Sequence, residues 1–88
     1  MESESTIIRE IENTVAGGAY SDWQIGITTD PIQQKAHLGN PLIWVHWEAD
    51  SVKTARNVYN HFLQRGMKSV SPPAKKATFV YILPAHIP

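Results

Sequence analysis

The spacing of apolar residues alternates along the chain between the helical period and the extended period. This alternation restricts the fold to a mixed arrangement of helices and strands. The clearest helical stretch spans residues 51–65, where apolar side chains recur every three or four positions and Gly66 follows the last of them. Shorter helices are predicted over residues 5–16 and 30–38. Strands are predicted over residues 22–28, 42–49 and 77–83.

These segments predict an α/β (α+β) fold: a single small domain over residues 1–88, with a three-stranded sheet packed against about three helices. Residues 67–76 hold prolines, serines and lysines without a periodic apolar face, so this segment is predicted to be a flexible loop. Residues 84–88 are predicted to be a frayed tail. The pattern leaves the order of the strands open.

The predicted strand 42–49 carries a tryptophan on each face, Trp44 on one and Trp47 on the other. A strand with large apolar side chains on both faces is typical of the centre of a sheet, so this strand is predicted to be central. In strand 22–28, Gly26 is expected to leave room for a neighbouring backbone or a ligand. The predicted helix caps, in chain order, are Ser3 or Ser5, Thr29 or Asp30, and the pair Asp50-Ser51, of which Asp50 is favoured.

The chain contains no cysteine, which excludes disulfides, thiolate metal sites and cysteine nucleophiles. Its four histidines lack metal-site spacing, and its glycines form neither a phosphate-binding loop nor a dinucleotide fingerprint. We therefore expect no metal and no cofactor. The N-terminal segment is acidic and polar, and no apolar run approaches the length of a membrane span. We expect a cytoplasmic protein without a membrane partner.

Charge is distributed unevenly, although the formal net charge is zero. Residues 1–34 contain six acidic residues and one arginine, whereas residues 35–88 contain seven basic residues and two acidic ones. Such asymmetry is typical of a surface that meets phosphates or an acidic protein. It also fits two halves that face each other, or a dimer that pairs them. The isoelectric point near 6.9 lies far from the basic values of dedicated nucleic-acid-binding domains.

The segment from Trp23 to Pro31, WQIGITTDP, resembles the second strand and following turn of GIY-YIG nuclease domains. A tryptophan-rich strand and a helix with an alanine near its start follow, so the resemblance covers about residues 20–65. It implies a small α/β scaffold, with a catalytic arginine on the helix after the turn and a metal-binding glutamate on the long helix.

The positions that carry this chemistry in the family differ in this chain. The family tyrosine is replaced by Gln24, the arginine position falls near Gln34 or Lys35, and the glutamate position falls on or near Tyr59. No Gly-Ile-Tyr strand precedes residue 23. The strand 77–83 could supply that strand in a circularly permuted version, with Tyr81 in the place of the family tyrosine.

Without a carboxylate to hold a metal and an arginine to hold a phosphate, the sequence favours a non-catalytic protein over an enzyme. We expect a small binding or interaction module of bacterial or phage type that acts through a protein partner or self-association. The alternatives are a nucleic-acid-binding module that uses the basic second half, and a divergent nuclease. No catalytic or metal-binding residue is assigned. The candidate contact residues are basic, aromatic or histidine side chains: Lys35, Trp44, His46, Lys53, Arg56, Lys75, Lys76 and Tyr81.

Overall fold

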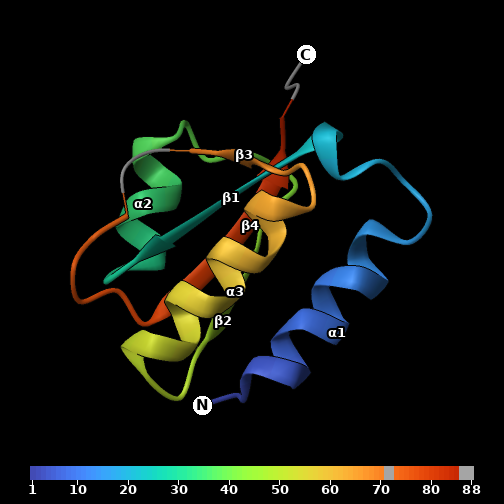
Figure 1. Cartoon of the computed structure of the whole chain (residues 1–88). Helices are drawn as coiled ribbons and strands as arrows, with labels where there is room; N and C mark the ends of the chain where they lie inside the picture. The colour runs from blue at the N-terminus through green and yellow to red at the C-terminus, as the bar shows by residue number, and fades with distance from the viewer. Residues whose placement is uncertain (71–72, 86–88) are drawn as a thin grey trace.

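A computed structural model of the chain describes residues 1–70 and 73–85. The elements are helix α1 (Glu4–Val15), a 3-10 turn η1 (Tyr20–Asp22), strand β1 (Trp23–Thr28), helix α2 (Pro31–His37), strand β2 (Val45–Glu48), helix α3 (Val52–Gln64), strand β3 (Lys68–Ser69) and strand β4 (Phe79–Pro84). The three predicted helices and three predicted strands are confirmed, with boundaries that differ by at most three residues. Figure 1 shows their arrangement.

In the part of the chain that the structure describes, the sheet has four strands in the order β2-β4-β1-β3, so the prediction of three strands is wrong by one. Strand β4 runs antiparallel to both of its neighbours, and β3 runs parallel to β1. Strand β3 lies inside the segment predicted to be a loop. It is held there by the buried side chain of Met67 and by a 2.6 Å hydrogen bond between the hydroxyls of Tyr59 and Ser69. A strand this short has no periodic pattern from which to predict it.

Strand β2 is an edge strand, so the prediction that it is central is wrong. Neither Trp47 nor Trp44, which directly precedes β2, needs a second neighbouring strand. Trp47 is covered by α1, whose Glu10 accepts a 2.9 Å hydrogen bond from the indole Nε1, and the ring of Trp44 lies on Tyr81. The strands flanked on both sides are β1 and β4, and β4 is the run in which apolar residues face both ways.

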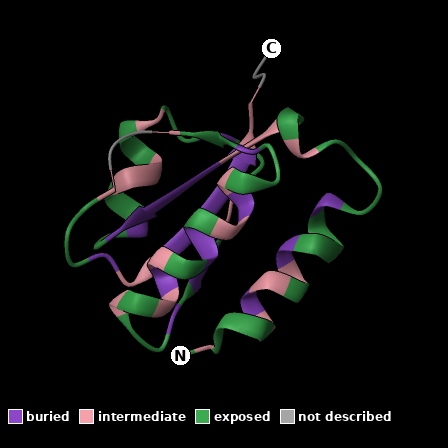
Figure 2. Cartoon of the chain, viewed as in Figure 1, coloured by how far each residue is buried: buried purple, intermediate pink, exposed green. Residues whose placement is uncertain are grey.

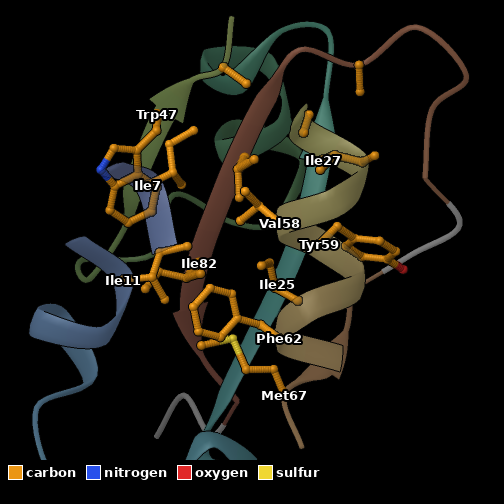
Figure 3. Packing of buried hydrophobic residues seen from close by; sticks show 14 of the residues in the cluster. Ile7, Ile11, Ile25, Ile27, Trp47, Val58, Tyr59, Phe62, Met67 and Ile82 are labelled. Atoms are coloured by element: carbon orange, nitrogen blue, oxygen red, sulfur yellow. The ribbon is translucent and has the colours of Figure 1, made fainter. Parts of the chain in front are cut away.

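Helices α1 and α3 cover one face of the sheet, and α2 lies on the other (Figure 1). The core lies between the sheet and the two helices α1 and α3. Figure 2 shows buried positions on the sides of these helices that meet the sheet. In Figure 3, Ile7 and Trp47 lie side by side near the β2 edge, and Phe62 lies close to Met67 near the C-terminal end of α3. The other labelled members of the core are Ile11, Ile25, Ile27, Val58, Tyr59 and Ile82.

Each helix is capped by a side chain that accepts a backbone N–H from its first turn. The caps are Ser3 for α1, Asp30 for α2 and Ser51 for α3. For α3 the cap lies within the predicted pair Asp50-Ser51, but it is Ser51, so the preference for Asp50 is wrong. The extended backbone of Ser51 directly precedes the first helical residue and brings its hydroxyl within 3.0 Å of the N–H of Thr54.

Candidate interaction surface at the edge of the sheet

On the face of the sheet that α2 covers, the central side chain is that of Tyr81, which is only 1% exposed. Tyr81 is the Cα partner of Gly26 across β1 and β4, and a Cβ at Gly26 would overlap its hydroxyl oxygen and Cζ. Gln34 of α2 donates a 3.1 Å hydrogen bond to the hydroxyl. The ring of Trp44 stacks on that of Tyr81, with centroids 4.6 Å apart and planes 13° from parallel. The room predicted at Gly26 is therefore filled by a side chain of the protein itself.

Trp44 also forms a hydrogen bond with His46, which lies two residues later on β2. Its indole Nε1 donates a 3.0 Å hydrogen bond to Nδ1 of His46, so the neutral imidazole carries its proton on Nε2. The edge of the His46 ring meets Phe79 of β4, with centroids 6.3 Å apart. Trp44 and His46 thus lie on the same face of the sheet, as side chains two residues apart on an extended backbone must.

The backbone groups of β2 divide between the two sides of the strand. Ala49 donates a 2.8 Å hydrogen bond to Thr78, which precedes β4, so the odd-numbered residues face β4. Glu48 faces the opposite way: its carbonyl accepts a 2.8 Å hydrogen bond from the N–H of Glu2. By this alternation the N–H and C=O of His46 point outward from the sheet. No other residue within 1–70 and 73–85 pairs with this side of β2 at His46.

Exposed apolar side chains flank this open stretch of backbone at both ends. Leu42 is fully exposed and Ile43 is 56% exposed, just before the start of β2. At the other end, Glu2 pairs with Ala49, and Met1, which is 85% exposed, precedes it. We call the group formed by Met1, Leu42, Ile43, Trp44 and His46 the β2 edge surface.

A separate polar pocket of about 280 Å³ lies where β1 meets the start of α2. Its lining residues are Thr28, Thr29, Asp30, Gln33, Gln34 and His37. Two of the lining side chains already form hydrogen bonds with the local backbone: the carboxylate of Asp30 accepts the N–H of Gln33, and the hydroxyl of Thr28 accepts the N–H of Asp30. Within the described part of the chain, no three His, Asp or Glu side chains could hold a metal ion together.

The structure brings together three of the candidate contact residues from the sequence: Trp44, His46 and Tyr81. The side chain of Tyr81 is buried beneath Trp44, so Trp44 and His46 form the accessible part of this group. Lys35 belongs to α2, on the same side of the sheet as this group.

The other four candidates lie elsewhere. Lys53 and Arg56 belong to α3, which covers the opposite face. Lys75 and Lys76 are exposed in the segment that leads into β4. The eight candidates therefore do not form one continuous surface.

Sequence reasoning missed the apolar residues of the β2 edge surface. The sequence pattern places Leu42 and Ile43 inside the predicted strand 42–49 and gives no sign that they are exposed. An apolar pair directly after the turn at Asn40 and Pro41 was the available signal. This apolar pair indicates an exposed surface only when the strand order is known, because that order places β2 at the edge of the sheet.

No protein-family model matches this chain, and no curated protein or solved structure shows a significant match to it. Among the helices of residues 1–70 and 73–85, none combines the length and the apolar character that crossing a membrane requires.

Proposed function

We propose that this protein is a non-catalytic interaction module that accepts an extended segment of a protein partner at the β2 edge surface. The observation that carries this proposal is the outward-pointing backbone of His46 beside the exposed Leu42 and Ile43. A strand edge with open N–H and C=O groups is a template for a further strand, and apolar side chains beside it add affinity.

Edge strands that must stay unpaired usually carry protective features. These include lysines, prolines, bulges or a covering loop. Strand β2 reads Val-His-Trp-Glu and contains neither lysine nor proline. At the far end of β2, within residues 1–70 and 73–85, Glu2 covers the edge through a single bridge to Ala49. The edge is therefore left open over the part where the apolar side chains gather, which favours a partner there.

A protein partner fits this surface better than a nucleic acid does. A polyanion would need clustered lysines and arginines, and the basic candidates lie on both faces of the sheet. The charged residues close to the β2 edge are acidic: Glu2, Glu48 and Asp50. Acidic groups at this position would repel phosphates and would not hinder the pairing of a strand.

We place this module on a scaffold similar to that of GIY-YIG domains, in a permuted form. Two observations support this: β4 pairs antiparallel with β1, and Tyr81 lies opposite Gly26 in that pair. The positions that would hold the nuclease chemistry serve the fold instead. Gln34 bonds the hydroxyl of Tyr81, and the hydroxyl of Tyr59 bonds Ser69.

The proposal is tested by titrating the ¹⁵N-labelled protein with a peptide that has the sequence of residues 42–48 and two added lysines for solubility. We expect the amide signals of Trp44 and His46 to shift, and we expect Leu42→Lys to weaken binding about fivefold or more. Ile32→Lys is the matched control. Ile32 is also exposed, at 68%, but it lies on α2 and is no part of the β2 edge surface.

A twelve-residue thymidine oligonucleotide serves as the competing probe. If the peptide causes no shift and the oligonucleotide binds with a logarithmic salt slope of about −0.7 for each phosphate contact, the proposal is wrong. Strand pairing should change little between low and moderate salt, because it uses backbone hydrogen bonds and apolar contacts.

A further inference from the structure

We infer that the segment received at the β2 edge surface is strand β2 of a second copy of this chain. The two strands would pair antiparallel about a two-fold axis, joining two four-stranded sheets into one continuous sheet. This inference rests on the proposed function and adds the identity of the partner and the register of pairing.

The positions of the outward-pointing groups select the register. The backbone groups of His46 point outward, and the alternation along an extended chain gives Trp44, two residues earlier and directly before β2, the same direction. A two-fold axis at Val45 brings each His46 opposite Trp44 of the other copy, and each such pair exchanges two backbone hydrogen bonds. An axis at His46 would need the carbonyl of Glu48, which already accepts the N–H of Glu2.

The same axis matches the apolar ends of the edge to each other. With Val45 opposite its own mate, the ladder ends at the Trp44–His46 pairs. The bend at residues 42–43 of one copy then comes next to the end of β2 of the other copy, where Glu2 already occupies the outward side of Glu48. Met1 lies near Glu48, because the adjacent Glu2 donates its N–H to the Glu48 carbonyl. The exposed Met1 of each copy therefore comes close to the exposed Leu42 and Ile43 of the other, at both ends of the interface. A surface that complements itself in this way is what a two-fold dimer requires.

The interface formed by one short strand and these apolar side chains is small. Contacts of this size are typical of weak and transient assemblies. We therefore expect a dimer that forms at about 10–500 μM and dissociates on dilution. Such a dimer has an exchangeable edge: a copy that separates from its mate exposes the edge again.

Cysteine crosslinking tests the register, because the chain has no cysteine of its own. Val45 and its mate would form a non-hydrogen-bonded pair with Cα atoms about 4.5 Å apart, which suits a disulfide. We expect Val45→Cys to form a disulfide-linked dimer under mild oxidation at about 100 μM. His46→Cys is the register control, since its mate would lie about 8 Å away and beyond bridging distance. Ile32→Cys, exposed on α2, measures random collision.

Formation of the Val45→Cys dimer about fivefold faster than that of either control supports the inference. Faster crosslinking of His46→Cys would overturn it, because the register would then be different. Circular dichroism and thermal melting confirm that each variant is folded before crosslinking. Sedimentation of the unsubstituted chain gives an independent measurement, with Leu42→Lys expected to abolish the dimer and Ile32→Lys to leave it.

A chain that stays monomeric up to about 1 mM and crosslinks no faster than Ile32→Cys also overturns the inference. The peptide titration then separates the two proposals. If the peptide of residues 42–48 still shifts the amides of Trp44 and His46, the edge accepts a free extended segment but not the folded edge of a second copy, and the proposed function stands without the dimer. If it does not, both proposals fall.

Discussion

The side chain of Tyr81 occupies the space in which Gly26 would carry a Cβ. The two residues are direct partners across β1 and β4, and Trp44 stacks on the tyrosine ring. Glycine at position 26 is therefore a packing requirement, and it does not depend on an unusual backbone angle. On the face of the sheet that α2 covers, Tyr81 thus contacts Gly26 of β1 on one side and Trp44, which precedes the edge strand β2, on the other.

Gly26→Ala is expected to destabilise the protein by about 2 kcal/mol or more, because a methyl group there overlaps the ring of Tyr81. The midpoint of urea unfolding measures the effect. In the double variant Gly26→Ala/Tyr81→Val, the two losses should be less than additive, since the smaller side chain removes the overlap. Fully additive losses would show that the ring does not restrict position 26.

Trp47→Phe is expected to cost about 1–2 kcal/mol, because it removes the partly buried hydrogen bond from the indole to Glu10 and part of the contact with α1. A double-mutant cycle with Glu10→Ala isolates the hydrogen bond, for which we expect a coupling of about 1 kcal/mol. Glu12→Ala, on the exposed side of α1, is the matched control. A coupling near zero with Glu10 would mean that this hydrogen bond adds nothing to the packing of Trp47 against α1.

Phe62→Ala is expected to destabilise the protein by about 3–5 kcal/mol, since Phe62 is fully buried between α3 and the sheet. A loss this large approaches the whole stability of a small domain, so the variant should be partly unfolded at 25 °C. Circular dichroism in the far ultraviolet reports this directly. Asn60→Ala, exposed on the same helix, should change the free energy of unfolding by less than about 0.5 kcal/mol.

The two residues before α3 allow a sharp comparison. Ser51→Ala should cost about 1 kcal/mol because it removes the acceptor of the Thr54 N–H, whereas Asp50→Ala should cost only a few tenths. Thermal unfolding of both variants side by side gives the difference. Equal losses would mean that the charge of Asp50 near the helix start matters as much as the cap.

The helices and the core were predictable because their signal is local. In α3 the spacing of Ala55, Val58, Tyr59 and Phe62 describes one face of a helix, and these residues are buried. The sheet was predictable only in part. Strand β3 has two residues, and the position of β2 depends on which strand pairs with β4, a choice made between segments far apart in the sequence.

The candidate surface could be predicted from the sequence only in part, because it too depends on pairing between distant strands. Trp44 and His46 stood out as an aromatic and a histidine on one face of a strand, and the structure brings them together. Nothing in the sequence distinguishes a tryptophan covered by a second strand from one covered by Tyr81. The exposure of Leu42 and Ile43 follows from the edge position of β2 and could not be predicted before it was known.

The position of β4 at the centre of the sheet has a consequence for the order of folding. Strand β4 follows the other three strands in the sequence, yet it separates β1 from β2 and supplies a partner to each. Its pairs with β1 join residues as distant as Trp23 and Pro84, so the chain must close a long loop before these pairs contribute. The β1–β4 ladder should then belong to the rate-limiting step, whereas α1 and α3 can form and dissolve locally on a much shorter timescale.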